Sequence, residues 1–508
     1  MNKFIFSDIL SIKNKGMESF KNSEKWPVSE EEFQEFSGFI YQQYEEIILN
    51  LEDDLFDIAL IDYKFQGVLL QIFHYNYVKN YAHKNDIDVI SEGDSQIYLH
   101  PDWDRISRQY SLFKPHHSKL IRFIRRAVKN IIFNKHLSFY KVIRNLFSSD
   151  NFVSIGSSSS LKKDFVLKEE IYCDHQEAYD LLNFYTDKEE LANKYHQELM
   201  DKLVSPYLKK LKFHKTMFLD GINISDIELC WSGRIKEIIP AYINILNSNS
   251  DKNFLVTEAS SLMNRILIIG YQRIGCKVFG FHHGGDFVAS IINQAHKNAM
   301  SHCQNLIVPT KGIADQYRKT YSCLELEAKI GTKYYPVEKS TRLFFNDKKT
   351  LRHKKNIKTV MLMGFPMSCQ RRVGESGLFF LSKIDIEFNI LTMLKESGLN
   401  VLYKAHPDRK DEVDGFFNSV ANEVVYDKFE NSWERADAFI FTYTSTTTFP
   451  FALTTDRKVV LIDVDANLVD KELREELGKR VDYVPATIKS DGNLIQFDEA
   501  SLKRCLLS

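Results

Sequence analysis

The sequence predicts an α/β protein with two Rossmann-like domains, each built on a parallel sheet with helices on both faces. Short apolar runs that suit buried strands alternate with helical patterns in two separate blocks of the chain. The 508 residues exceed what one hydrophobic core usually serves. A polar, basic stretch at 345–358 (FNDKKTLRHKKNIK) separates the blocks and is interpreted as a linker. We therefore expect an N-terminal domain over 1–345 and a C-terminal domain over 346–508.

The composition is that of a globular protein, with 44% hydrophobic and 27% charged residues. The formal net charge of -1 gives no overall attraction to nucleic acid, which is not an expected partner. Seven cysteines without a CxxC pair are typical of reduced thiols, not of a disulfide framework or a zinc site. No signal peptide is recognisable, and no apolar run approaches the roughly 18 residues of a membrane helix. We expect a cytoplasmic protein and leave open a position at the inner face of the membrane.

Helices dominate the first part of the chain, and strands follow. Residues 29–57 are acidic with apolar residues at helical spacing, and the next long helix leads into a strand at 87–91, before Glu92-Gly93. Further strands are predicted at 151–155 (NFVSI), 215–219 (KTMFL), 253–257 (NFLVT), 277–281 (KVFGF) and 305–309 (NLIVP). Helical patterns between these strands favour a parallel sheet that is covered on both faces.

A basic segment interrupts this block at 106–149, with ten Lys/Arg and no Asp or Glu. Apolar residues recur there at three- and four-residue steps, which predicts a basic amphipathic helix or helix pair. Such a helix over 114–146 could contact an anionic membrane or an anionic acceptor. Alternatively, the helix has an ordinary solvated face or complements the charge of the acidic region upstream. The balanced charge of this half of the chain slightly favours this second interpretation.

The C-terminal block predicts five strands, in TVMLMGFP, NVLYKAHP, VVYDKF, ADAFIFTYT and KVVLIDVD. A helix in FNILTMLKESG separates the first two strands, and Gly398 is expected to terminate it, because glycine readily adopts the left-handed conformation found there. Five strands with short connections predict a compact Rossmann-like domain of about 150 residues.

Ligands of open parallel sheets bind beyond the carboxyl ends of the strands, so residues that end strands are the candidates. His406 ends one strand, and Pro407 biases it toward extended geometry, which holds the imidazole at the sheet edge. There it could donate to a phosphate oxygen, with Lys404 and Arg409 adding positive potential. The alternative is an ordinary turn with a solvent-facing histidine.

Five consecutive hydroxyl residues, Thr444 to Thr448, end another strand, and Pro450 marks the first turn of the next helix. Free N–H groups, hydroxyls and the positive end of the helix dipole together form an anion site. Simple N-capping needs only one hydroxyl, so the run favours a phosphate site formed by Thr444, Ser445, Thr446 and Thr447. Gly364 and Arg371 end the first strand of this block, where Arg371 could meet a donor's phosphate or a charged sugar.

The N-terminal block offers candidates for a base and for acceptor binding. His282, His283 and Asp286 surround Gly284 and Gly285 in HHGGD, where glycines allow close approach and histidine can take a proton near neutral pH. A glycine turn with one structural histidine is the rival interpretation.

Three carboxylates complete the candidates. Glu258 follows a predicted strand, and Asp220 and Glu92 each precede a turn glycine as possible bases, although turns alone explain such residues. No Asp-x-Asp motif stands out, so we expect no metal ion. The absence of GxGxxG, GxxxxGK(S/T), GxSxG and HExxH argues against dehydrogenases, NTPases, α/β-hydrolases and zinc proteases.

Taken together, residues 250–460 resemble bacterial GT-B glycosyltransferases. His406-Pro407 followed 39 residues later by Ser445-Thr446 is similar to the HP and Ser-Ser/Thr motifs of bacterial sialyltransferases and Kdo transferases. In those families the two motifs hold the phosphate and ribose of a CMP-activated acidic sugar. HHGGD resembles a His-Gly turn of CDP-glycerol glycerophosphotransferases and several capsule transferases. Leu219-Asp220-Gly221 lacks the first acid of the catalytic turn of sialyltransferases, which leaves the base open between Asp220, His283 and Asp286.

The resemblance implies a GT-B fold whose two sheets face a cleft. It also implies a metal-independent, cofactor-free transfer of a sugar, expected to be a CMP-activated acidic sugar, to a cell-surface glycan or lipid-linked glycan of capsule or lipopolysaccharide. A CDP-glycerol or CDP-ribitol phosphotransferase of wall or capsule polymer synthesis is the first alternative. A non-catalytic glycan-binding scaffold is the second.

Overall fold

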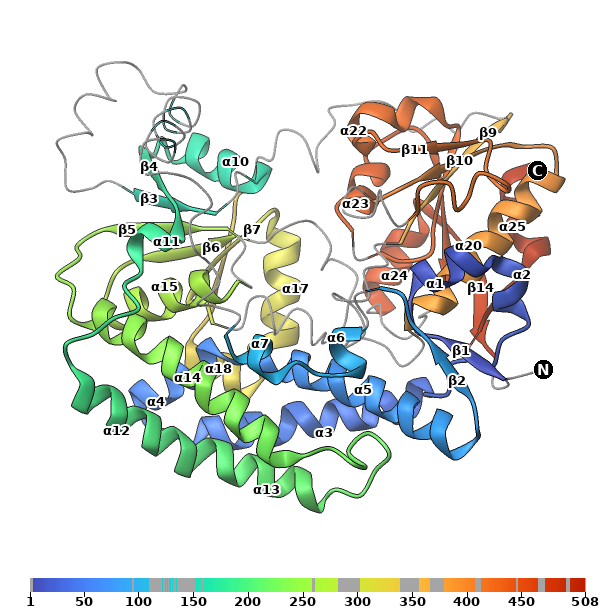
Figure 1. Ribbon diagram of the computed structural model, residues 1–508. Coiled ribbons are helices and arrows are strands. Elements are labelled where there is room, and N and C mark those ends of the chain that lie inside the picture. The colour runs from blue at the N-terminus through green and yellow to red at the C-terminus, as the bar shows by residue number, and fades with distance from the viewer. Residues whose placement is uncertain are drawn as a thin grey trace.

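The computed structural model describes residues 3–93, 96–108, 152–156, 159–257, 261–281, 302–338, 356–365, 379–406, 413–444, 446–464, 471–489 and 494–507, and the single helical positions 121, 124, 126, 128, 130 and 134. Two α/β bodies lie side by side, and a layer of long helices lies beneath the first of them (Figure 1). The prediction of two parallel sheets is confirmed. The linker predicted at 345–358 lies almost wholly outside the described residues.

The first sheet is parallel throughout and has six strands in the order β4-β3-β5-β6-β7-β8. In chain order the strands are β3 (Phe152–Ile155), β4 (Cys173–Gln176), β5 (Asn253–Val256), β6 (Val278–Phe281), β7 (Asn305–Val308) and β8 (Lys333–Pro336). The connecting helices include α10 (Ser160–Lys168), α15 (Leu262–Arg273), α17 (Lys311–Tyr321) and α18 (Glu325–Ile330). The chain runs outward to β4 and then returns past β3, so the direction of winding switches between β3 and β5.

The second sheet has seven strands in the order β11-β10-β9-β12-β13-β14-β15. Its predicted strands are β9 (Thr359–Met363), β10 (Asn400–Lys404), β11 (Glu423–Val425), β12 (Ala438–Phe441) and β13 (Lys458–Asp463), all parallel. The prediction missed β14 (Val481–Ile488), which is parallel to β13, and β15 (Ile495–Phe497), which is antiparallel to β14. No strand was predicted at β14, because Pro485 and several exposed side chains obscure the pattern of a buried strand. Here the winding switches between β9 and β12.

Helices cover both faces of the second sheet, and side chains that alternate along each strand pack against one face or the other. Val360 and Leu362 of β9 pack in the core beneath α20 (Phe379–Glu396), whereas Met361 and Met363 pack on the opposite face. That opposite face is covered by α22 (Phe429–Ser432), α23 (Thr448–Leu453) and α24 (Lys471–Gly478), and α25 (Glu499–Leu507) returns to the first face. Gly398 follows α20 with a φ of 78°, as predicted for a residue that terminates a helix.

The helical layer accounts for most of the N-terminal helices. It comprises α3 (Glu30–Leu49), α4 (Asp53–Ile61), α5 (Phe65–Lys84), α12 (Glu189–Leu199), a π-helical turn (Met200–Val204), α13 (Ser205–Phe213) and α14 (Ile224–Leu246). The acidic stretch at 29–57 is helical as predicted, and a capping box between Ser29 and Glu32 starts α3. None of the helices among the described residues is both long and apolar enough to cross a membrane.

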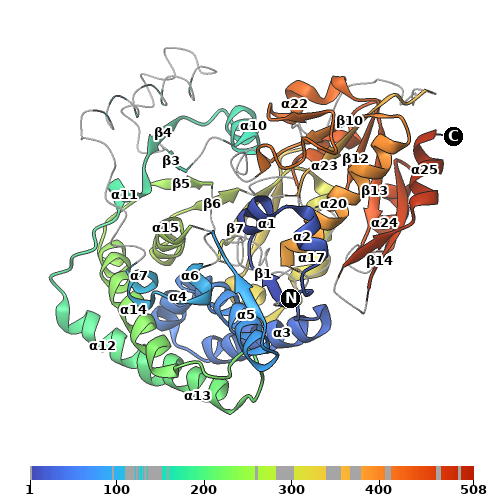
Figure 2. The same cartoon turned by 45° about the vertical axis from the view of Figure 1, so that its right-hand side comes forward.

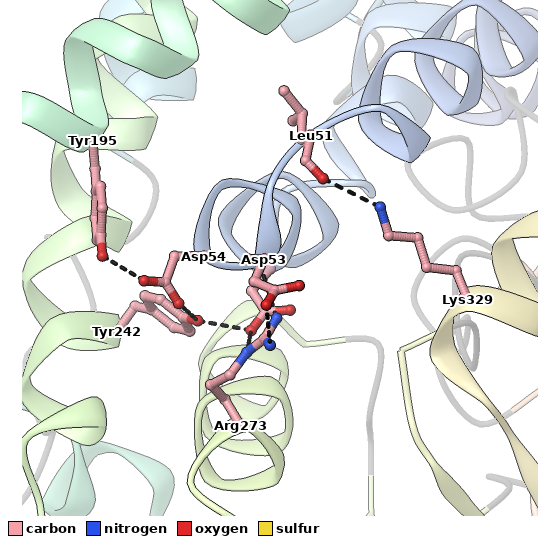
Figure 3. A network of polar contacts seen from close by, with 8 residues as sticks. Leu51, Asp53, Asp54, Tyr195, Tyr242, Arg273 and Lys329 are labelled. Carbon is pink, nitrogen blue, oxygen red and sulfur yellow. Dashed lines mark hydrogen bonds and ion pairs between the residues drawn. The ribbon is translucent and has the colours of Figure 1, made fainter.

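A polar network ties α4 to its neighbours (Figure 3). Arg273 of α15 donates from Nε to Oδ2 of Asp57 at 2.7 Å, and Tyr242 of α14 donates to the same oxygen at 2.7 Å. Tyr195 of α12 donates to Asp54 at 2.5 Å. Burial raises the pKa of Asp57, and the bonds from Arg273 and Tyr242 only partly offset this. The Asp57 anion therefore depends on Arg273 for its charge partner.

The first residues of the chain contact the second body as well as residues that follow the helical layer. β1 (Phe4–Phe6) pairs in parallel with β2 (Asp88–Ile90), and α1 (Ile9–Lys15) and α2 (Met17–Lys21) lie beside α20 in both views (Figures 1 and 2). The ammonium of Lys21 lies 5.6 Å from the ring centroid of Phe388 on α20. Residues 4–21 thus contact both α5 of the helical layer, through the hydrogen bond from the Tyr75 hydroxyl to the carbonyl of Ser7, and α20 of the second body.

Asp8 fastens this N-terminal segment. Its buried carboxylate accepts hydrogen bonds from the backbone N–H groups of Ser11, Glu92 and Gly93 at 2.8 to 3.0 Å, and from the hydroxyls of Ser11 and Ser91. Burial would raise the pKa of Asp8, but these hydrogen bonds outweigh it and lower the pKa below its ordinary value. Asp8 therefore links the start of α1 to the end of β2.

The strand predicted at 215–219 is wrong, because residues 214–223 form turns between α13 and α14. Phe218 stacks on Phe36 of α3 at 4.3 Å, so the apolar run serves the helical layer. The side-chain amides of Asn76 and Asn80 donate to the backbone carbonyl of Asp220. Asp220 therefore does not end a strand.

We predict that Asp8→Asn lowers the free energy of unfolding by about 2 kcal/mol, because an amide cannot accept all the hydrogen bonds that converge there. Urea unfolding followed by tryptophan fluorescence measures the change. The folded-state pKa is lowered, so the wild-type advantage should hold above the ordinary aspartate pKa of about 3.9 and disappear as the pH falls through the folded-state pKa. Asp187→Asn, at an exposed position, is the control and should change stability by less than about 0.5 kcal/mol. Equal effects of the two substitutions would contradict this role of Asp8.

We predict that Arg273→Met lowers the free energy of unfolding by roughly 3 kcal/mol at neutral pH, because it leaves the Asp57 carboxylate buried without its charge partner. The folded-state pKa of Asp57 is already raised, so protonation at lower pH should recover part of the loss, as should the double variant Arg273→Met/Asp57→Asn. Arg108→Met removes an exposed ion pair with Asp104 and should cost less than about 1 kcal/mol. Thermal or urea unfolding at two pH values distinguishes these results, and a loss that grows toward acid pH would be inconsistent with the assignment.

Candidate functional site

The candidate site lies at the carboxyl edge of the second sheet, where the winding switches between β9 and β12. Crevices at such switch points are the usual ligand sites of open parallel sheets. Gly364 follows β9, His406 follows β10 two residues after its end, and the hydroxyl run begins three residues after β12. Since β9 lies between β10 and β12, the two predicted phosphate-binding segments leave the same edge on either side of one strand.

The peptide groups of Gly364 form hydrogen bonds with residues on both neighbouring strands, Lys404 at the end of β10 and Tyr443 after β12. The N–H of Gly364 donates to the carbonyl of Lys404 at 2.9 Å, and the hydroxyl of Tyr443 donates to the carbonyl of Gly364 at 3.0 Å. Neighbouring strands lie about 4.8 Å apart, so the segments that carry His406 and Thr444 leave the sheet roughly 10 Å apart. That separation suits a single phosphorylated ligand.

Gly364 has no room for a side chain. A Cβ atom there would lie 2.4 Å from Oη of Tyr403 and 2.8 Å from the carbonyl oxygen of Lys404. The phenol of Tyr403 donates to Glu387 of α20 at 2.9 Å, and the N–H of Phe365 donates to the other oxygen of the same carboxylate at 2.6 Å. Glu387 is fully buried, so it fixes the ends of β9 and β10 together.

Aromatic rings border the same edge. Phe365 and Tyr443 meet edge to face with ring centroids 4.8 Å apart, and both are half-buried. The ammonium of Lys383 lies 5.2 Å from the centroid of the Phe365 ring and donates to the carbonyl of Thr442 at 3.5 Å. The edge therefore offers a cation and an aromatic surface next to the hydroxyl run.

The hydroxyl run is organised by its own hydrogen bonds. The N–H of Thr446 donates to the carbonyl of Thr444 at 2.7 Å, and the hydroxyls of Thr446 and Thr448 lie 2.7 Å apart. α23 starts at Thr448 with Pro450 in its first turn, as predicted, but it has only six residues. Hydroxyls, more than a helix dipole, therefore supply the hydrogen-bond donors of this segment. Thr444, Thr446 and Thr447 are partly exposed and accessible to a ligand.

Lys404 differs from its expected position at the open edge. Strand alternation turns it toward the face of Leu402, where it is 4% exposed and donates to the carbonyl of Ala405 at 2.5 Å. Burial lowers the pKa of Lys404 to about 8, and the nearby carboxylates of Glu430 and Asp427 only partly oppose this. Near neutral pH Lys404 is a buried cation behind the edge. His406 is half-buried beyond it.

Most other predicted site residues lie outside the described residues, and their roles stay predictions. They are Pro407, Arg409, Ser445 and Arg371 on the donor side, and Glu258, His282, His283, Gly284, Gly285 and Asp286 in the first half. The strands that precede Glu258 and His282, β5 and β6, are adjacent and parallel in the first sheet. The two strands therefore end at the same edge of the first sheet.

Of the two carboxylates expected beside a turn glycine at a strand end, Glu92 follows a strand and Asp220 does not. Asp220 lies between α13 and α14, where its carboxylate forms an ion pair with Lys84 at 3.5 Å. Glu92 follows β2 in the small two-stranded sheet, as predicted, and accepts a hydrogen bond from Asn14. Neither residue lies at the end of a strand of the two large sheets. Among the described residues no group of three His, Cys, Asp or Glu is placed to hold a metal ion.

Sequence reasoning missed Glu387, Tyr403 and Tyr443. A visible signal for Glu387 was its position in the apolar pattern of the helix that ends at KESG, where a lone carboxylate must find buried partners. Tyr403 and Tyr443 each stand next to a motif that was recognised, and their hydroxyls required partners in the folded chain.

The comparisons with known proteins are sparse. No family model and no curated protein matches the chain. Among solved structures, a UDP-glucosyltransferase from Polygonum tinctorium capable of glucosylating indoxyl, in complex with 3,4-dichloroaniline, matches over 70% of this chain and 88% of its own, with 12% identity and a TM-score of 0.33. At that TM-score the likeness is too distant to bear on function, so the proposal below rests on the site.

We predict that Gly364→Ala lowers the melting temperature by several degrees, because its Cβ would overlap both a side chain and the backbone carbonyl of Lys404. Gly312→Ala is the matched control, because Gly312 lies in the first turn of α17 and its added Cβ would lie 4.0 Å from Oγ1 of Thr310. It should be neutral or slightly stabilising. Differential scanning calorimetry compares the two variants, and a neutral Gly364→Ala would show that the strand ends are not held as closely as described.

Proposed function

We propose that this protein is a glycosyltransferase that binds the phosphate of a nucleotide-sugar donor at the carboxyl edge of its second sheet. The observation that carries the proposal is the pair of hydrogen bonds from Gly364 to Lys404 and from Tyr443 to Gly364. These bonds support a single anion site between His406 and the hydroxyl run. Both segments offer donors suited to phosphate oxygens.

The chemistry follows from the position of the negative charge. In glycosyl transfer the bond between the anomeric carbon and the donor phosphate breaks, and its electron pair stays on the phosphate oxygen. Donors that already point at this oxygen stabilise the charge as it develops, at no cost of reorganisation. His406, Thr444, Thr446 and Thr447 are the described residues proposed for this role.

The acceptor is proposed to bind on the side of the first sheet. Its hydroxyl forms the new bond to the anomeric carbon and loses its proton to a base. The candidates for the base are His282, His283 and Asp286, which follow β6, and Asp220, which does not end a strand. Glu258, Gly284 and Gly285 are proposed for acceptor binding. A base in this position contributes roughly 10²–10⁴-fold to the rate.

The finer proposal is a CMP-activated acidic sugar as donor and a glycan or lipid-linked glycan as acceptor. It depends on the resemblance of His406-Pro407 and Ser445-Thr446 to the motifs of transferases that use such donors. The half-buried Phe365 and Tyr443 offer an aromatic surface that a nucleobase could contact.

A thermal-shift panel with CMP, CDP, UDP, GDP and their sugars tests the proposal, since a ligand that binds the folded state raises its melting temperature. We expect a cytidine nucleotide to give the shift. Its affinity should fall roughly tenfold to a hundredfold in His406→Ala and in Thr446→Val, because each loses a hydrogen bond to a charged group. His83→Ala, at the end of α5, and Thr216→Val, between α13 and α14, lie away from this edge; they are the matched controls and should keep the wild-type affinity.

Each other outcome has a definite meaning. A shift with UDP or GDP compounds alone would reject the cytidine donor, and a shift that both site variants retain would reject the site. Release of CMP from CDP-glycerol or CDP-ribitol would instead support a phosphotransferase. No shift with any nucleotide would support a non-catalytic glycan-binding scaffold.

A further inference from the structure

One edge of the first sheet is covered by asparagine side chains of a helix instead of by another strand. β4 is an edge strand, and the asparagine at helical position 134 pairs with its backbone like a neighbouring strand. Oδ1 of Asn134 accepts from the N–H of Cys173 at 2.9 Å, and its amide donates to the carbonyl of Cys173 at 2.8 Å. The N–H of His175 donates to Oδ1 of Asn130 at 2.6 Å. These bonds satisfy the edge groups that would otherwise invite another strand.

Arg126 adds a charged contact on the same side. It donates from Nε to Asp174 of β4 at 3.0 Å, and Asn130 donates to the same carboxylate oxygen at 3.0 Å. Positions 126, 130 and 134 are four residues apart, so they share one face of a helix. The polar face of this helix therefore turns toward the protein.

The opposite face is apolar and exposed. Ile121, Ile124 and Val128, here called the apolar stripe, are 45%, 52% and 48% exposed. At about 100° per residue, the apolar stripe lies on the order of 150° around the helix from Arg126, Asn130 and Asn134. Helices on the surface of a globular protein normally show the reverse arrangement, with apolar residues inward.

We propose that the apolar stripe lies on an anionic membrane surface. Charge favours this partner, since residues 106–149 carry ten Lys/Arg and no Asp or Glu. A basic segment with an apolar face binds the boundary between lipid headgroups and acyl chains. A second copy of this chain is a poorer partner, because two such segments would bring like charges together.

The consequence is a defined orientation of the first body. The bonds to Cys173 and His175 fix the helix to β4, so a membrane that receives the apolar stripe would be held at the β4 edge of the first sheet. This inference does not depend on the proposed transfer reaction, because lipid binding can be measured with no nucleotide present.

Vesicle co-sedimentation of the full-length protein tests the inference. We expect binding to phosphatidylcholine vesicles with about 30% phosphatidylglycerol, little binding to pure phosphatidylcholine, and weaker binding as NaCl rises from about 0.1 to about 0.5 M. Ile124→Ser/Val128→Ser should weaken binding roughly tenfold or more, because two apolar side chains lose their contact with lipid. Phe213→Ser/Leu229→Ser replaces two residues of the helical layer that are each 73% exposed, and should bind like wild type.

The remaining outcomes overturn the inference. They are no binding to anionic vesicles, equal binding by Ile124→Ser/Val128→Ser, or an equal loss in the control variant. A protein that is dimeric in light scattering and becomes monomeric in Ile124→Ser/Val128→Ser would assign the apolar stripe to a second copy. All substituted side chains are exposed, so unchanged melting temperatures should show that each variant is folded.

Discussion

The carboxylate of Glu387 is the constraint on which the candidate site depends. It is buried in α20 and accepts one hydrogen bond from the N–H of Phe365, after β9, and one from the phenol of Tyr403, on β10. A buried carboxylate is costly unless its oxygens are satisfied, so these two partners are held in a narrow range of positions. The close approach of Gly364 to Tyr403 follows from this, and with it the alignment of the strand ends beside His406 and the hydroxyl run.

Much of the fold could be predicted because burial leaves a clear pattern. The strands of both parallel sheets, apart from short or partly exposed ones, are continuous apolar runs such as 359–363 and 438–441, and each ends at a glycine or a polar turn. β14 and β15 were missed because Pro485 and exposed positions hide the first, while the second has only three residues. No strand was predicted at β4 or β8 either, since both are partly exposed and lack a continuous apolar run. A strand was wrongly predicted at 215–219, because the apolar residues of this turn are buried against α3 and not in a sheet.

The site was predictable in part. The order of the strands follows from tertiary pairing, which the sequence does not display. The rule that ligands bind beyond strand ends nevertheless selected Gly364, His406 and Thr444, which the structure places after three neighbouring strands. The same rule misplaced Lys404, whose side chain turns inward, and it could not find Glu387, which acts from a helix. The orientation of the helix that carries the apolar stripe could not be predicted either. The spacing of its residues shows that it has an apolar and a polar face, but not which face contacts the protein.

The position of α1 and α2 beside α20 has a consequence for the order in which the chain can fold (Figure 2). Ile5, Phe6, Ile9 and Ile12 are at most 3% exposed in the finished protein, but α20 begins only at Phe379. A ribosome therefore releases the N-terminal segment and its partners at residues 88–93 long before α20, against which α1 and α2 lie, has been synthesised. Closing so long a loop is slow and carries an entropic cost, so the contact of α1 and α2 with α20 is expected to form late in folding.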